Sequence, residues 1–265
     1  MKYGLHKLIC TLGWLLTTSC LWAQQDSIIT RATLYGVGFA NVFDTYLSPQ
    51  EYKGVDFRMS RESMKMTRRW ENISQQTFFQ ADLSYTHNKV DNNNTLAALA
   101  NWNYGLHYHF PIHSNLTLLA GGVADLNGGF VYNLRNGNNP AQARAYINLA
   151  ASGMAIWKTR IRQLPLTLRY QLNLPLLGLM FMPHYGQSYY EIFSLGHASG
   201  VVNVTSLHNQ PSLRQMLTAD FPLGNAKMRL AYVWDAQQAK VNHIKMHHYA
   251  HVFMVGFVKE FVLVR

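Results

Sequence analysis

Hydrophobic and polar residues alternate with a period of two in segment after segment of this chain. Between Trp102 and Phe110, every second residue is aromatic or aliphatic, and the residues between them are Asn, Gly and His. Residues 166–174 and 227–235 repeat the pattern. Such alternation is typical of a β-strand with one apolar and one polar face. Weaker alternation predicts further strands over residues 31–43, 55–66, 73–86, 116–133, 144–158, 213–221 and 249–263.

The predicted strands are longer than those of soluble proteins. Strands of globular domains usually have about five or six residues, whereas about 9 to 11 residues cross a bilayer at a tilt. Aromatic residues near segment ends, such as Trp102, Phe110 and Trp157, suit the interfacial girdles of transmembrane barrels. The pattern therefore predicts an all-β fold, an antiparallel transmembrane β-barrel. A periplasmic β-sandwich is the competing interpretation.

The spacing of the strands predicts the lengths of their connections. The long ones are residues 44–53, 87–95, 134–141 and 237–248. The short ones are residues 67–72, 111–115, 160–163 and 223–226. Because bacterial outer-membrane barrels have short periplasmic turns and longer extracellular loops, this order predicts a periplasmic amino terminus. Residues 177–211 then form one extracellular excursion of a ten-stranded barrel, which we favour, or add a strand pair and give twelve strands.

Residues 1–23 have the pattern of a secretory signal peptide. A basic start and the apolar stretch 8–16 precede Ala23, after which we place the cleavage site. Cys20 makes a lipoprotein signal the competing interpretation. Cleavage after Ala23 leaves residues 24–265 as a single barrel domain, exported through the Sec pathway. It also removes both cysteines, so the mature chain would be held together without disulfide bonds.

The composition agrees with a location in the cell outer membrane. Charged residues make up 14% of the chain, against about a quarter in a soluble domain, which argues against an ordinary cytosolic enzyme. The formal charge is +10, but the basic residues are scattered and form no single stripe, so nucleic acid is not an expected partner. The expected partners are outer-membrane lipids, lipopolysaccharide and the barrel assembly machinery. No cofactor or metal is expected.

Three segments in the last third of the chain resemble a known family. They are residues 182–193 (MPHYGQSYYEIF), 208–214 (HNQPSLR) and 252–259 (VFMVGFVK). These segments are similar to an uncharacterised family of Bacteroidota outer-membrane β-barrel proteins, a domain of unknown function. The resemblance implies an outer-membrane barrel of a Gram-negative bacterium and carries over no activity. One departure is Arg265, because many such barrels end in an aromatic residue; Phe261 is the nearest candidate for that anchor.

His197 and Ser199 form a candidate catalytic pair. Residues two apart on a strand share a face, so the imidazole could act as base for the hydroxyl, with Asn203 or Glu191 as third member. The pair resembles the His-x-Ser pair of outer-membrane phospholipase A and lipid A deacylases, which implies a lipid acyl hydrolase. Gly200 stands where those enzymes have asparagine, and the flanking glycines favour a solvated loop.

A second group combines aromatic rings with amide and carboxylate groups. It consists of Tyr185, Gln187, Tyr189, Tyr190 and Glu191. Such a group could stack on a sugar or hold a polar ligand. Tyrosines of a long loop can also fold inward and plug the lumen, which is the interpretation we favour.

Basic residues gather in the predicted loop before the last strand. Lys240, Lys245, His247 and His248 are expected to contact lipopolysaccharide phosphates. In an extended segment, histidines four residues apart lie about 13 Å from each other, too far to share a metal ion. We therefore expect a basic rim here and no metal site.

Charged residues on the polar faces are expected to pair inside the barrel. The arginines are Arg144, Arg169, Arg214 and Arg229, and their expected partners are Asp82, Asp125, Asp220 and Asp235. A satisfied polar interior would hold the barrel rigid. The sequence thus predicts a small surface scaffold or narrow pore, with the acyl hydrolase as the rival function.

Overall fold

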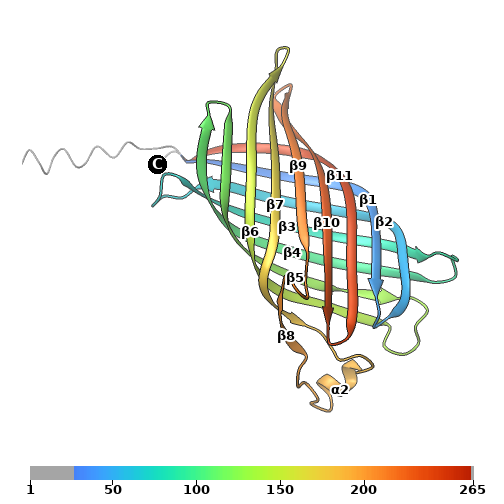
Figure 1. Cartoon of the computed structure of the whole chain (residues 1–265). Coiled ribbons are helices and arrows are strands. Elements are labelled where there is room, and N and C mark those ends of the chain that lie inside the picture. The colour runs from blue at the N-terminus through green and yellow to red at the C-terminus, as the bar shows by residue number, and fades with distance from the viewer. Residues whose placement is uncertain (1–26, 264–265) are drawn as a thin grey trace, which may run out of the picture.

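The computed structural model describes residues 27–263 and shows a closed antiparallel β-barrel (Figure 1). Its strands are β1 (Ser27–Asp44), β2 (Ser48–Met66), β3 (Ile73–Asn88), β4 (Asn94–His113), β5 (Leu116–Asn133), β6 (Ala141–Ile161), β7 (Leu164–Phe181), β8 (Val202–Ser206), β9 (Leu213–Leu223), β10 (Ala226–Val241) and β11 (Ile244–Leu263). A short helix, α2 (Tyr189–Phe193), lies between β7 and β8. The predicted signal peptide and Arg265 lie outside the described residues. No helix within residues 27–263 is long and apolar enough to cross a membrane.

The wall of the barrel has ten strand positions. Neighbouring strands pair in sequence order, and β1 closes the wall by pairing with β11. β8 and β9 both pair with β7, β8 with residues 177–181 and β9 with residues 167–173. They therefore occupy successive parts of one position. This confirms the prediction of ten strands over twelve.

The break between β8 and β9 has a local cause. On β7, the pairing with β6 skips Leu176 next to Pro175, which marks a bulge. On the other side of the break, Pro211 precedes β9. Proline has no N–H to donate to a ladder and is confined to edges and bulges. The wall is consequently unpaired between β7 and its neighbour over residues 174–176.

Two predicted long loops are short turns. The prediction for residues 237–248 is wrong, because β10 and β11 continue to a turn formed by Asn242 and His243. Both turn residues have positive φ, 49° and 63°, as a tight hairpin turn requires. The predicted connection 44–53 likewise shrinks to residues 45–47. At the ends of β10 and β11, the apolar residues Val241, Ile244 and Met246 are buried inside whereas Lys240 and Lys245 are exposed, so the outward apolar pattern that marks a membrane strand is reversed there.

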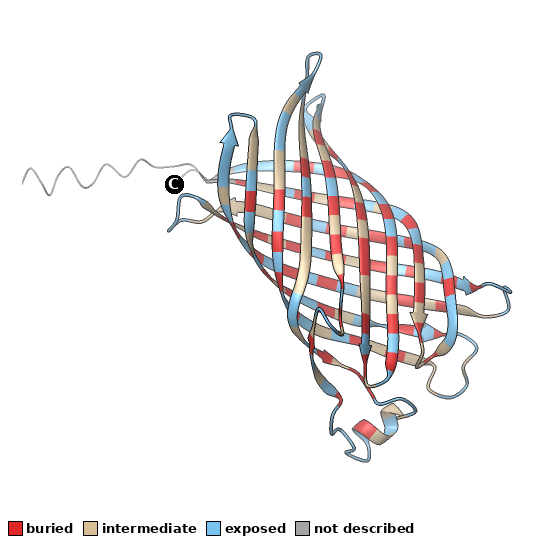
Figure 2. Ribbon diagram, viewed as in Figure 1, coloured by how far each residue is buried: buried red, intermediate tan, exposed pale blue. Residues whose placement is uncertain are grey.

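The barrel is polar inside and apolar outside. Figure 2 shows buried and exposed residues alternating along the strands. In β3 the inward positions include Gln76, Gln80 and Asp82, which are buried. In β1 the outward residues Tyr35 and Phe39 are 61% and 75% exposed. This is the reverse of a soluble protein and agrees with the predicted membrane barrel.

The barrel has two different ends. The start of β1 and the end of β11 lie at one end of the barrel, called here the terminal end, together with the turns β2–β3, β4–β5, β6–β7 and β9–β10. The opposite end, called the loop end, carries α2, β8 and the turns β1–β2 and β10–β11. The excursion predicted for residues 177–211 is at the loop end, although its first five residues belong to β7.

Glycine permits a close approach of β1 and β11 in this narrow barrel. A Cβ atom at Gly38 would lie 2.0 Å from the carbonyl oxygen of His251. At Gly153, by contrast, a Cβ atom would meet nothing within 4 Å. At Gly38, β1 therefore lies too close to the backbone of β11 to accommodate any side chain.

This close approach predicts a large difference between two glycine substitutions. Gly38→Ala should destabilise the barrel by about 1 to 3 kcal/mol through overpacking, whereas Gly153→Ala should have a small effect. Urea unfolding of the purified proteins in detergent measures both. Equal unfolding midpoints for the two variants would contradict the described approach of β1 to β11.

Candidate functional site

The lumen contains clusters of buried charged groups beside an apolar cluster, which consists of Leu34, Phe78, Met216, Ala231, Val233, Ala250, Val252 and Met254. Near the terminal end, Glu62 of β2 accepts two hydrogen bonds from the guanidinium of Arg169 of β7, each 2.7 Å long. Arg229 of β10 also donates to Glu62 and makes two further bonds to Asp220, at 2.6 and 2.7 Å. One carboxylate thus bridges two arginines from different sides of the barrel.

The middle of the lumen is organised around Asp235 of β10. Its Oδ2 lies 3.2 Å from Nη1 of Arg58 and 3.1 Å from Nη2 of Arg214. Gln80 donates to the same oxygen at 3.2 Å, and Gln237 donates to the other oxygen at 3.0 Å. Bonds to charged groups are stronger than neutral ones, so this cluster ties β2, β3, β9 and β10 together.

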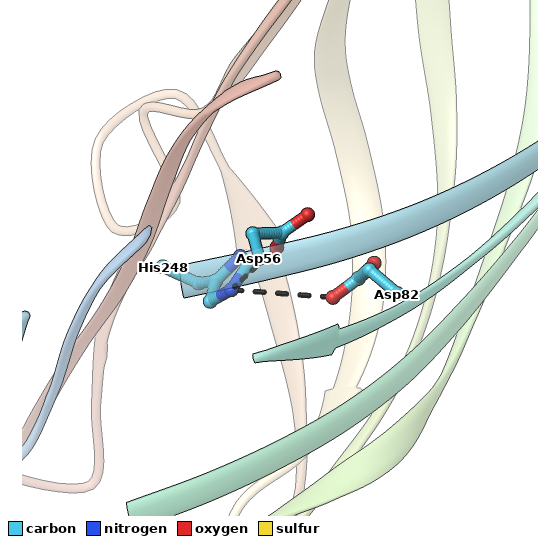
Figure 3. A group of neighbouring side chains, drawn as sticks. All are labelled: Asp56, Asp82 and His248. Atoms are coloured by element: carbon cyan, nitrogen blue, oxygen red, sulfur yellow. Dashed lines mark ion pairs between the residues drawn. The ribbon is translucent and has the colours of Figure 1, made fainter. Parts of the chain in front are cut away.

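Three residues beside this cluster could hold a metal ion. Asp56, Asp82 and His248 come from β2, β3 and β11 and point toward one another (Figure 3). One ligand atom from each lies within 4.8 Å of the others. However, Arg58 donates to both oxygens of Asp56, at 3.3 Å each, and a cation would have to displace that guanidinium. We therefore interpret the three residues as part of the lumen charge network.

Carboxyl groups outnumber arginines in the described interior. Its buried charged residues are Arg58, Arg144, Arg169, Arg214, Arg229, Asp44, Asp56, Glu62, Asp82, Asp125, Asp220 and Asp235. Five arginines thus face seven carboxylates. Amides take the place of the missing cations: Asn101, Asn127 and Asn148 all donate to Asp125. Buried polar groups need such partners because an unpaired one is costly.

The predicted ion pairs are correct in part. Arg229 pairs with Asp220 and Arg214 pairs with Asp235, so these two arginines find partners among the expected aspartates. Arg144 and Arg169 do not: Arg144 pairs with Asp44, at 3.0 Å, and Arg169 pairs with Glu62. Asp82 lies 3.9 Å from Arg58, which is outside the expected set of arginines.

Two apolar clusters close the loop end of the lumen. The first consists of Ala40, Val42, Leu47, Tyr52, Ala97 and Val131, and the second of Met180, Met182, Ala239, Val241, Ile244 and Met246. Tyr46, in the β1–β2 turn, packs against both. Its hydroxyl donates to the carbonyl of Gln187 at 2.8 Å. Burial and the neighbouring Tyr189 raise the pKa of Tyr46 to about 12, so this donor stays protonated at physiological pH.

Little space remains between the clusters. A cavity bordered by Asn148, Asn173 and Arg214 has a volume of about 20 Å³. Another, beside Asp82 and His248, is also about 20 Å³. Each is about the size needed for one water molecule, which is too small to admit a solute.

The predicted plug residues do not share one role. Tyr185 and Tyr190 are 68% and 66% exposed, so the expectation that they plug the lumen is wrong. Tyr189 packs on the rim, where its hydroxyl donates to Gln142 at 3.1 Å and accepts from a β6 backbone N–H. Gln187 holds the loop by donating to the carbonyl of His197 at 2.7 Å.

Glu191 has a structural role in the loop. It forms a capping box with Ser188 at the start of α2, in which each side chain bonds the other residue's backbone N–H. These hydrogen bonds hold the pKa of the Glu191 carboxyl below its ordinary value. The carboxylate is thus occupied in ordering the loop, and the expectation of an inward plug does not apply to it.

The structure does not assemble the proposed catalytic pair. His197 and Ser199 lie in exposed turns, not on one face of a strand, and no hydrogen bond within residues 27–263 joins their side chains. Asn203 donates to the carbonyl of Gly200 at 3.0 Å and does not reach the pair. Gly196 and Gly200, which flank the pair, both have positive φ, and their presence in the sequence indicates this turn.

The basic residues of the β10–β11 hairpin divide between two faces. Lys240 and Lys245 are direct cross-strand partners at the loop end and are exposed. His247 is on the outer wall, stacked on Tyr249 with ring centroids 4.3 Å apart. His248 is buried in the lumen, 3.1 Å from the Ser84 hydroxyl. The expectation that His248 contacts lipopolysaccharide is therefore wrong, because successive residues of a strand face opposite sides.

The Glu62 bridge gives a stability prediction. Glu62→Ala should cost about 3 to 5 kcal/mol, because it leaves two buried guanidinium groups without their shared carboxylate. The control is Glu260→Ala, which removes an exposed pair with Lys227 and should cost at most about 1 kcal/mol. Unfolding midpoints in detergent measure both. Similar midpoints would contradict the central role of the bridge.

The comparisons with known proteins identify a family and find solved structures of low similarity. No curated protein sequence matches the chain. Similar solved structures include the transport unit of the autotransporter AIDA-I from Escherichia coli, at 9% identity, covering 89% of this chain and 92% of that one, with a TM-score of 0.43. The translocator domain of NalP from Neisseria meningitidis matches at 10% identity over 97% of both chains, with a TM-score of 0.39. No activity is carried over at these levels of likeness.

The family is shown by the sequence itself. The profile described as "Protein of unknown function (DUF3316)" matches residues 8–265, which is nearly the whole chain, so the protein belongs to this family.

Proposed function

We propose that the protein is an integral outer-membrane barrel that serves as a closed surface scaffold. It would be exported through the Sec pathway of a Gram-negative bacterium, and the three segments named above support an origin in the Bacteroidota. The barrel would hold the ordered segment 182–212 on the cell surface. The single observation that carries this proposal is the lumen filled by paired charges and closed by apolar clusters.

The outer wall has the height of a membrane barrel. On β1 the outward residues change from Arg31 to the apolar Tyr35, Val37 and Phe39 and then to Asn41. Ten residues rise about 24 Å at about 3.4 Å per residue and a tilt of about 45°. The apolar band of an outer-membrane barrel is about 25 Å tall. This agreement supports a bilayer between the levels of Arg31 and Asn41.

The two ends support an orientation. Bacterial barrels have short turns in the periplasm and longer loops outside, so the loop end would face the medium. Lys240 and Lys245 would then lie at the outer rim, where lipopolysaccharide phosphates would compensate their charges.

The displayed segment is ordered and rich in exposed aromatic rings. The Ser188 capping box, the Tyr46 bond to Gln187 and the pairing of β8 with β7 hold its backbone. Tyr185, Tyr190 and Phe193 remain exposed at its surface. Rigid aromatic side chains are favourable contacts for sugars and proteins, so this face is the proposed contact surface of the scaffold.

Conductance separates the scaffold from a narrow pore. Purified protein in a planar lipid bilayer should give no stable current steps, because the interior cavities are too small for a hydrated ion path. Arg214→Ala with Asp235→Ala serves as the comparison, since it removes a central pair and enlarges the lumen. Regular single-channel steps from the unmodified protein would overturn the closed-scaffold proposal.

Cysteine labelling tests the orientation. Ala198→Cys places a thiol in the exposed turn after α2, and the chain has cysteines otherwise only at positions 10 and 20. A membrane-impermeant maleimide should label this thiol on intact cells, whereas the control Gly224→Cys, in the β9–β10 turn, should be labelled only after the outer membrane is permeabilised. The reverse pattern would show that the loop end faces the periplasm.

A further inference from the structure

Three basic side chains gather on the outer wall near the terminal end. Arg31 of β1, Arg61 of β2 and Lys259 of β11 are all exposed and alternate with inward residues on their strands. The described interior has an excess of carboxylates, whereas the chain as a whole has a formal charge of +10. The unneutralised positive charge of this protein is therefore on its outside, and part of it is concentrated here.

The strand register brings these charges together. Arg31 is the direct cross-strand partner of Lys259. Arg61 is the partner of Thr33, one outward position further along β1. Direct partners have Cβ atoms about 5 Å apart and diagonal ones about 7 to 8 Å apart, and like charges placed directly opposite each other are destabilising. An anion bound between them would remove that repulsion.

No carboxylate of the described residues supplies this anion. None lies within 4.0 Å of the charged groups of Arg31, Arg61 or Lys259, and the nearby Glu260 pairs with Lys227 at 2.7 Å. Lys53 at the opposite end differs, because Glu51 lies 3.7 Å from it. The cluster is thus positive without an internal counter-charge.

An apolar groove adjoins the three cations. It has an open volume of about 670 Å³ and is bordered by Tyr35, Met228, Val255, Phe257 and Phe261, as well as by the three basic residues. The guanidinium of Arg31 lies over the Phe261 ring, 5.3 Å from its centroid. Such stacking holds an arginine in place. The surface therefore combines a fixed positive end with an apolar track toward the middle of the wall.

We propose that this surface binds an anionic phospholipid of the periplasmic leaflet. The lipid phosphate lies between Arg31, Arg61 and Lys259, and an acyl chain lies in the groove along Tyr35 and Phe257. Charge complementarity and the level of the cluster, at the boundary of the apolar band, identify this occupant. The proposal rests on the membrane location and orientation proposed above.

Retention of lipid by the purified protein tests the proposal. The full barrel is incorporated into mixed detergent micelles containing equal amounts of phosphatidylglycerol and phosphatidylcholine, and native mass spectrometry counts the lipids that stay bound. Phosphatidylglycerol should be retained preferentially. Replacing Arg31, Arg61 and Lys259 together by Gln should lower the retention of phosphatidylglycerol at least about tenfold. The reason is that each basic residue near a membrane surface attracts anionic lipid, and three such attractions are lost.

A matched variant controls for total charge. Replacement of Lys53, Lys89 and Arg135 by Gln removes the same charge from exposed positions at the loop end and should leave phosphatidylglycerol retention unchanged. Equal losses in the two triple variants, or equal retention of both lipids, would overturn the proposal. If about 10 mM inorganic phosphate alone displaces the bound lipid, the site binds free phosphate and the lipid proposal is overturned.

The outcome is independent of the scaffold proposal. A folded barrel runs faster on gels unheated than boiled, because its closed wall has no free edges, and both triple variants should keep this shift. A variant that keeps the shift but retains the lipid would refute the lipid site and leave the closed barrel intact. Conductance of the unmodified protein would refute the closed scaffold without affecting the lipid measurement.

Discussion

The structure depends on the pairing of buried charges in a narrow lumen. A closed barrel of ten strands satisfies its backbone hydrogen bonds in the wall, but its polar side chains face inward, where they must find partners among themselves. Glu62 pairs with both Arg169 and Arg229. Asp235 likewise pairs with both Arg58 and Arg214. Removing one partner of such a pair is far more costly than the pair itself is stabilising. The network therefore holds one register and one closed interior.

The filled interior determines where function can reside. Paired charges and the apolar cluster that includes Leu34, Phe78 and Val252 occupy the rest of the lumen, and two further apolar clusters close the loop end around Tyr46. The lumen has no room for a solute, so a function that needs a solute inside the barrel is not expected. The surfaces that remain are the ordered loop with α2, the basic rim at Lys240 and Lys245, and the basic groove at Arg31. All three face lipid or solvent, which agrees with a scaffold.

The sequence was sufficient to predict the features that depend only on residues close together in the chain. Period-two alternation predicted the strands, and turn positions predicted ten of them. The two ion pairs that join an expected arginine to an expected aspartate, Arg229–Asp220 and Arg214–Asp235, are direct partners across the β9–β10 hairpin. A hairpin turn fixes register, so residues equally far from the turn at 224–225 are predictable partners.

Pairings across the lumen could not be predicted in this way. Arg169 meets Glu62 and Arg144 meets Asp44 from strands that are not neighbours. Their meeting depends on the tilt and diameter of the closed barrel, which no local pattern encodes. The prediction for His248 is wrong for a related reason. It assigns His248 to a loop together with its neighbours, whereas His248 belongs to β11 and faces the lumen. The candidate pair His197 and Ser199 failed because an assumed strand is a glycine-flanked turn.

The most direct test of a filled, paired interior is the exchange of arginine side-chain protons with water. In the structure, Nε–H groups of Arg58, Arg214 and Arg229 each donate to a buried carboxylate. Nuclear magnetic resonance of the barrel in micelles should show these three Nε–H signals persisting at mildly alkaline pH, while those of the exposed Arg68 and Arg69 disappear. Loss of all arginine signals at the same rate would mean that water fills the lumen and would contradict the account.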